Sequence, residues 1–143
     1  NDLITKIMDE TTLKIIPFEG IGPLRFGMNA DQVRDLLSNP NTFKRNEFSG
    51  GVTDAFREIG VFAEYDASDT LILVEAASPC TPIFQGIRLA GSVEEVVQAL
   101  ADAGHEGKQD DVGYSYDLYG FGLYAPSFEE IEGVSVFSED YYD

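Results

Sequence analysis

Apolar residues recur three or four positions apart in two short segments of the chain, residues 30–37 and 93–100. This spacing predicts two amphipathic helices, each with one apolar stripe. Asn29 and Ser92 precede these segments as N-caps, and a glutamine or a glutamate follows each cap by three residues, as in a capping box. Because both helices are short, each needs a sheet to pack against.

Outside these segments the period changes from helical spacing to alternation. The alternating segments are rich in Val, Ile, Phe and Tyr, which favours strands. They are separated by short polar turns, such as Asp66 to Asp69, where Asp and Ser side chains bond to their own backbone. This pattern predicts antiparallel meanders with strands within residues 13–18, 53–65, 70–77, 112–125 and 131–137.

The chain contains a similar segment twice. Residues 24–37 align without a gap on residues 87–100, and residues 56–63 resemble residues 116–123. Self-similarity of this kind indicates a repeated structural unit. We therefore predict an α+β fold of two tandem units of helix plus antiparallel strands, with the helices packed on one face of a shared antiparallel sheet. The expected boundaries are a loose N-terminal arm or short helix over residues 1–12 and a single domain over residues 13–143, with repeats of about 13–80 and 81–143.

Gly60 aligns on Gly120, and this match predicts which side chains share a face of the long strand in each unit. One side is apolar and is expected to face the helices. The other side mixes aromatic and acidic residues, as a protein-binding sheet does. This second side is predicted to carry Phe56, Glu58, Phe62 and Glu64 in the first unit and Tyr114, Tyr116, Leu118 and Tyr124 in the second.

Charge narrows the range of partners. The chain has 143 residues and a net charge of -17, which argues against binding to nucleic acid or an anionic membrane. Residues 1–80 carry a net charge of -6 and residues 81–143 a net charge of -11, and residues 109–143 contain no Lys or Arg. Two interpretations stay open: a binding surface for a basic partner, or a solvated acidic surface.

The sequence contains few candidate catalytic residues. Cys80 is the only cysteine, expected to be a small packed residue, and His105 is the only histidine, expected to face solvent in a loop. A serine nucleophile has neither a Gly-x-Ser-x-Gly turn nor a second histidine for a relay. No spacing of Asp and Glu matches a calcium loop, and no phosphate-binding glycine run is present. We expect no enzyme and no cofactor or metal; a carboxylate enzyme or a small-ligand binder remains a weaker alternative.

Two families resemble parts of this chain. Residues Phe26 to Pro40 are similar to the Gly-Met-Thr-x-x-x-Val-x-x-x-Leu-Gly-x-Pro signature of the small outer-membrane assembly lipoproteins. The tandem helix and meander resembles the β-lactamase inhibitory protein fold. By class and charge, the acidic chain with its opening segment Gly20 to Met28 also resembles bacterial immunity proteins for secreted toxins, whose nuclease domains are usually basic.

These observations predict a non-catalytic protein-binding inhibitor, an immunity protein that neutralises a basic toxin; the alternative is an envelope-associated scaffold module of a larger complex. The chain is expected to be cytoplasmic, or periplasmic if a leader was removed, and its oligomeric state stays open. For the Tyr residues, contact with a partner and simple cover of the sheet are both open interpretations. The predicted partner-binding residues are Asp110, Asp111, Tyr114, Tyr116, Asp117, Tyr124, Glu139, Asp140, Tyr141 and Tyr142.

Overall fold

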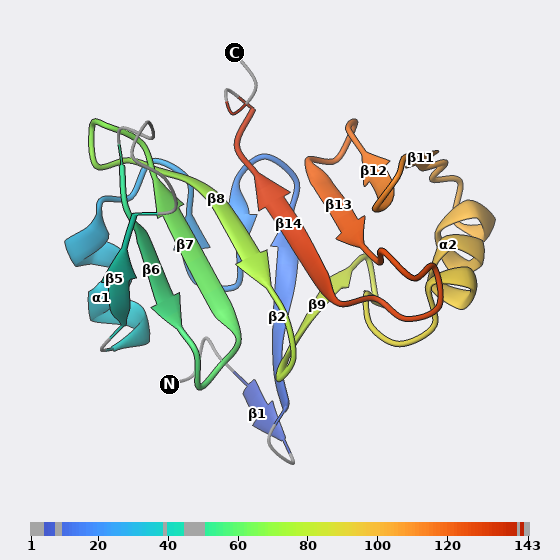
Figure 1. Cartoon of the computed structure of the whole chain (residues 1–143), viewed down its shortest axis with the longest axis horizontal. Coiled ribbons are helices and arrows are strands. Elements are labelled where there is room, and N and C mark those ends of the chain that lie inside the picture. The colour runs from blue at the N-terminus through green and yellow to red at the C-terminus, as the bar shows by residue number, and fades with distance from the viewer. Residues whose placement is uncertain (1–4, 8–9, 39, 45–50, 140, 142–143) are drawn as a thin grey trace.

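A computed structural model describes residues 5–7, 10–38, 40–44, 51–139 and 141. Within this part the chain forms two helices and fourteen strands, which Figure 1 shows in order from blue to red. The elements are β1 (Thr5–Ile7), β2 (Glu10–Ile16), β3 (Gly20–Ile21), β4 (Leu24–Arg25), α1 (Ala30–Leu37), β5 (Asn41–Phe43), β6 (Thr53–Phe56), β7 (Val61–Tyr65), β8 (Leu71–Ala76), β9 (Cys80–Phe84), β10 (Ile87–Arg88), α2 (Val93–Asp102), β11 (Lys108–Gln109), β12 (Gly113–Tyr116), β13 (Phe121–Tyr124) and β14 (Gly133–Phe137).

The larger sheet has eight antiparallel strands in the order β11-β12-β13-β14-β8-β7-β6-β5. Each half of the chain contributes four consecutive strands, and the halves meet where β14 pairs with β8. In that pairing Ser135 lies opposite Glu75, and Val136 lies opposite Val74. A single sheet is therefore built from segments about sixty residues apart.

The smaller sheet has the order β10-β9-β2-β3-β4, and β1 pairs with β2 beside this path. Strands β2 and β9 are parallel, whereas its other pairs are antiparallel. In Figure 1, β2 and β9 lie behind β8 and β14. Buried side chains of both sheets form one core, including Leu13 and Phe84 from the smaller sheet and Val74 and Val136 from the larger. This arrangement confirms the α+β class.

The loose arm predicted for residues 1–12 is wrong for the part of that segment that the structure describes. Residues 5–7 pair with residues 10–12, and Thr11 lies opposite Cys80 in the parallel pairing with β9. The Thr11 N–H also donates to the Pro79 carbonyl at 2.8 Å, and Thr11 is fully buried. The sequence predicted this strand only from residue 13, and pairing with β1 and with the distant β9 extends it back to Glu10.

Both helix N-termini are confirmed. In α1 the Asn29 side chain accepts a hydrogen bond from the Gln32 N–H, and the Gln32 side chain accepts one from the Asn29 N–H, each at 2.9 Å. In α2 the Ser92 hydroxyl accepts from the Glu95 N–H at 3.3 Å. Figure 1 places α1 at the β5 end and α2 at the β11 end of the larger sheet. Neither helix in the described part of the chain has the length and apolarity to cross a membrane.

The two segments predicted as long strands are hairpins. Strands β6 and β7 are separated by residues 57–60, and β12 and β13 by residues 117–120. In the second hairpin Tyr116 lies opposite Phe121. An even-numbered residue of β12 therefore shares its side of the sheet with an odd-numbered residue of β13, whereas in one continuous strand the two would lie on opposite sides. The predicted faces are therefore wrong for residues that precede each turn: Phe56 and Tyr116 point into the core.

The two hairpins make corresponding backbone contacts. The Gly60 carbonyl accepts from the Ala77 N–H at 2.8 Å, and the Gly120 carbonyl accepts from the Phe137 N–H at 2.9 Å. Both glycines have a positive φ, of 73° and 70°. These matched contacts agree with the alignment of Gly60 on Gly120, while the tandem duplication itself stays a prediction.

We expect Gly60→Ala to destabilise the fold strongly. An added Cβ would lie 2.0 Å from the Ala77 carbonyl oxygen, in addition to the cost of a positive φ. Urea unfolding should show a loss of about 3 kcal/mol, against about 1 kcal/mol for Gly104→Ala, which has a positive φ and open space around it. Equal losses in the two variants would contradict the close approach at Gly60.

Candidate functional site

The outer face of the larger sheet is the side that points away from the smaller sheet. In β7 the buried Val61 and Ala63 alternate with the half-buried Phe62 and Glu64. The register then carries the outer side across the sheet, because Phe62 lies opposite Glu75, Glu75 opposite Ser135, and Ser135 opposite Gly122. We define the outer face by Phe62, Glu64, Glu75, Gly122, Tyr124 and Ser135.

A hollow of about 480 Å³ lies on this face over β7, β8, β13 and β14. Phe62 and Tyr124 supply aromatic rings at it, and Glu75 and Glu132 supply carboxylates. The β14 residues Gly133 and Ser135 are small, so they leave a depression between the rings of Phe62 and Tyr124. The hollow therefore combines aromatic surface with negative charge.

The structure shows one cation that uses this aromatic surface. The guanidinium carbon of Arg57 lies 5.7 Å from the centroid of the Phe62 ring. A cation at this distance over an aromatic face is attracted by the ring quadrupole. At the hollow, Tyr124 is 47% exposed, so a side chain from outside can reach its ring.

The predicted partner-binding residues that the structure describes lie in several different places and do not form one surface. Asp110 and Asp111 are exposed in the turn before β12, near the Tyr124 end of β13, since Gly113 lies opposite Tyr124. Asp117 is exposed in the turn at the other end of β12. The exposed Glu139 and the half-buried Tyr141 follow β14, whose last residue bonds to Gly120 in that same turn. Asp140 and Tyr142 lie outside the described residues.

Two predicted contact residues point to the inner side of the sheet. Tyr116 is 1% exposed and stacks on Phe121 with ring centroids 4.9 Å apart, so its place in a contact surface was wrong. Burial, together with the nearby Tyr114 and Glu106, raises the pKa of Tyr116 to about 12. Tyr114 lies opposite Leu123 on the same inner side and is half-buried. The reversal of alternation at the β12–β13 turn explains both placements.

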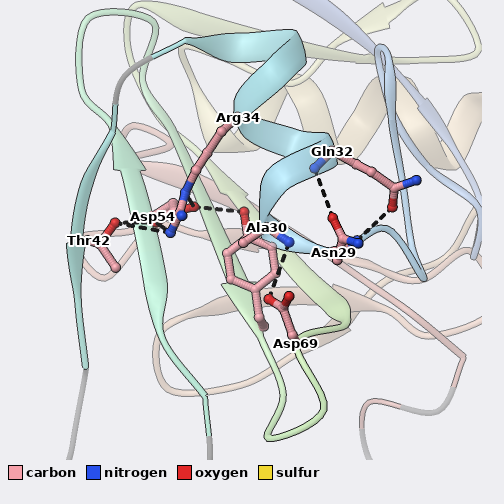
Figure 2. A network of polar contacts seen from close by, with 8 residues as sticks. Asn29, Ala30, Gln32, Arg34, Thr42, Asp54 and Asp69 are labelled. Atoms are coloured by element: carbon pink, nitrogen blue, oxygen red, sulfur yellow. Dashed lines mark hydrogen bonds and ion pairs between the residues drawn. The ribbon is translucent and has the colours of Figure 1, made fainter.

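A buried polar network joins α1 to the β5 end of the larger sheet (Figure 2). Arg34 Nε and Nη2 donate to the two carboxylate oxygens of Asp54 at 2.8 and 2.9 Å. Tyr65 donates to Asp54 at 2.9 Å, and Thr42 donates to it at 2.6 Å. The Asp54 side chain is fully buried, whereas the Arg34 side chain is 36% exposed. The network therefore anchors α1 on β5, β6 and β7.

Sequence reasoning missed this network. Asp54 lies between two residues that also become buried, Thr53 and Ala55, and a carboxylate in such a strand needs a charged partner. That was the one available signal, and it does not identify the partner. In the aligned second unit, the positions of Arg34 and Asp54 are taken by Val97 and Tyr114, so the two predicted units differ here.

Of the other residues considered in the sequence, Cys80 and Asp66 lie as expected and His105 does not. Cys80 is buried, as expected, and Asp66 forms the predicted turn by accepting hydrogen bonds from the Ser68 and Thr70 N–H groups. His105 is only 8% exposed, so the expectation that it faces solvent was wrong. Its Nε2 lies 2.9 Å from Gln85 Oε1, and its ring packs on Phe84 and Tyr119. No three His, Cys, Asp or Glu side chains converge on a possible metal position in the described part of the chain.

We expect the Asp54 network to make stability depend on pH. Burial works to raise the pKa of Asp54, but hydrogen bonds from Arg34, Thr42 and Tyr65 and the charge of Arg34 outweigh it, so the pKa is lowered. The stabilisation is therefore complete above the unfolded carboxylate pKa of about 3.9 and is lost as pH falls through the lower folded-state pKa.

Asp54→Asn should cost about 2 kcal/mol at pH 7, less than for a fully buried ion pair because water reaches Arg34. Urea unfolding of both proteins at pH 7 and at pH 3 measures the difference, which should shrink at pH 3. Asp35→Asn, at an exposed position of α1, controls for loss of a charge. A difference that is the same at both pH values would show that the Asp54 charge does not stabilise the fold.

Comparison with protein-family models, with curated proteins and with solved structures finds no match to this chain. The resemblance to the inhibitory protein fold and to the assembly lipoproteins therefore stays a prediction.

Proposed function

We propose that this chain is a non-catalytic protein-binding inhibitor, an immunity protein that neutralises a basic toxin, and that its outer face is the binding surface. The observation that carries this proposal is the hollow in that face, where Phe62 and Tyr124 lie with Glu75 and Glu132. Lys and Arg side chains of a basic partner suit such a surface, because their stems cover aromatic rings while their charges meet carboxylates.

The dimensions of the sheet support a protein partner rather than a small ligand. Strands lie about 4.8 Å apart, so eight strands span roughly 34 Å, which is the scale of a specific protein–protein interface. Tyr124 lies on β13, the third strand from the β11 edge, which pairs with β14, one of the two central strands. Interface residues that contribute most to affinity are typically aromatic and central.

The charge distribution supports the same class of partner. Residues 81–143 carry a net charge of -11, and they include Glu132 at the hollow and the exposed Asp110, Asp111 and Asp117. Since these aspartates lie at both ends of β12, they do not form one pocket. Their proposed role is to attract a basic partner over a wide area, while the outer face makes the close contacts.

The envelope-associated scaffold remains the alternative, supported by the signature around Gly27 and Met28. A scaffold binds its complex without abolishing the activity of a toxic partner. If co-expression of this chain abolishes the toxicity of its partner, the immunity proposal is supported; if the chain binds the partner and toxicity persists, the scaffold is supported.

We expect Tyr124→Ala to weaken binding to a basic toxin domain, where a neighbouring reading frame encodes one, by about 2 kcal/mol, or roughly thirtyfold, because it removes an exposed aromatic ring at the hollow. Glu132→Gln should weaken it by about 1 kcal/mol. Calorimetric titration measures both, and protection of growth on co-expression should weaken in parallel. Leu118→Ala, at an 82% exposed residue in the β12–β13 turn, is the matched apolar control and should bind as the unaltered chain does.

If Leu118→Ala lost affinity while Tyr124→Ala did not, the binding surface would be the β12–β13 turn and not the outer face. If the chain neither bound the toxin domain nor protected cells from it, the immunity proposal would fail.

Reversal of Asp110, Asp111 and Asp117 to Lys should act mainly on the association rate. Long-range attraction of a basic partner is lost, so the rate constant should fall at least tenfold at low salt, with little change in dissociation. Stopped-flow or surface-based kinetics at several salt concentrations measure this. An unchanged association rate and an unchanged salt dependence would exclude the electrostatic role of these residues.

A further inference from the structure

The smaller sheet has a basic face on the side away from the core. Lys14 and Arg88 are exposed there, and Arg25, Ile16 and Ile83 are half-buried. The register places Ile83 opposite Lys14 on one side and opposite Arg88 on the other. Ile83 therefore lies between two cations in one row across the strands. We call these five residues the basic face.

The basic face differs in charge from the rest of the molecule. Strands β2, β3, β4, β9 and β10 contain three of the nine Lys and Arg residues of the chain and one acidic residue, Glu10. The whole chain has a net charge of -17. In Figure 1, β2 and β9 of this sheet lie behind the larger sheet, so the basic face and the outer face are on opposite sides of the molecule.

The basic face is also hollowed. A depression of about 560 Å³ is lined by Thr12, Lys14, Ile16, Arg25 and Ile83, together with two glycines. Arg25 Nη1 donates to the Gly22 and Leu24 carbonyls at 2.7 and 2.8 Å, which fixes its guanidinium against the sheet. Among the described residues, Lys14 has neither an ion-pair nor a hydrogen-bond partner.

The spacing of the cations indicates the form of the ligand. Arg88, Lys14 and Arg25 lie on alternate strands, β10, β2 and β4, so neighbouring cations are roughly 10 Å apart and the set spans about 19 Å. A single carboxylate or phosphate is too small to contact all of them. A segment in the extended polyproline II conformation rises about 3.1 Å per residue and has three residues per turn, so acidic residues at every third position lie on one side about 9 Å apart and match this spacing.

We propose that the basic face is a second protein-binding surface, which takes an extended acidic segment of a partner polypeptide. Carboxylates of the segment pair with Arg88, Lys14 and Arg25, and apolar side chains between them cover Ile83 and Ile16. Nucleic acid is the less favoured polyanion, because a chain of net charge -17 repels a phosphate backbone and three cations release few counterions. This surface does not depend on the function proposed for the outer face.

The test uses the full chain and a fluorescent peptide with glutamate at every third position and proline and valine between, which favours the polyproline II conformation. Fluorescence anisotropy measures its affinity at low salt, and amide chemical shifts map its position. Shifts should cluster at Thr12, Lys14, Ile83 and Gly86. The same peptide with glutamine for glutamate should bind at least tenfold more weakly, and added salt should weaken the acidic peptide.

Variants separate the basic face from general charge effects. Lys14→Gln should weaken the acidic peptide about threefold, and Lys14→Gln with Arg88→Gln about tenfold. Lys44→Gln with Lys108→Gln removes the same charge at exposed positions next to β5 and in β11, at the two edges of the larger sheet, and should leave the affinity unchanged. The Lys14 variant alone keeps the test valid if loss of Arg88 disturbs the fold.

Three results would overturn the proposal. One is equal binding of the acidic and glutamine peptides, and another is a set of shifts on the larger sheet instead of the basic face. The third is an oligothymidine strand that binds at Lys14 and Ile83 more tightly than the acidic peptide. That last result would assign the face to nucleic acid.

Discussion

The pairing of β14 with β8 is the contact on which the rest of the structure depends. It joins two four-stranded halves into one sheet, because Val136 lies opposite Val74 and Ser135 opposite Glu75. On the inner side, β3 contacts β14 and β9 contacts β8, so the smaller sheet packs against this junction. On the outer side, the same register brings Glu75 beside Ser135 at the hollow. One set of backbone hydrogen bonds thus supports the core and the candidate site together.

The two sheets give the molecule two surfaces of different character. The outer face presents aromatic rings and carboxylates, whereas the basic face presents three cations around two isoleucines. Neither surface needs a buried catalytic group, since each would act through packing and charge complementarity. The polar network of Arg34 and Asp54 has a different role, because it is enclosed and connects α1 to the sheet.

The elements that could be predicted from sequence are those with local signals. The caps Asn29 and Ser92 act on backbone groups within three residues, and the structure shows both. The hairpin turns were missed because Tyr and Phe on both sides of residues 117–120 favour strand, and the two residues there that disfavour strand, Asp117 and Gly120, were not read as a turn. That omission alone placed Tyr116 on the wrong face of the sheet.

The candidate site was predicted only in part, because it depends on contacts between distant segments. Phe62 and Tyr124 were assigned to one face, and the register agrees, but Glu75 and Glu132 joined them only through the pairing of β8 with β14. In the same way, nothing near Lys14 in the sequence indicates that Arg88 lies two strands away.

The central claim is that the outer face binds a basic protein partner. Amide chemical-shift mapping of the full chain tests this, by titration with any basic toxin domain that a neighbouring reading frame encodes. The largest shifts should fall on Phe62, Tyr124, Gly133 and Ser135. Shifts confined to α1 or to the smaller sheet would contradict it.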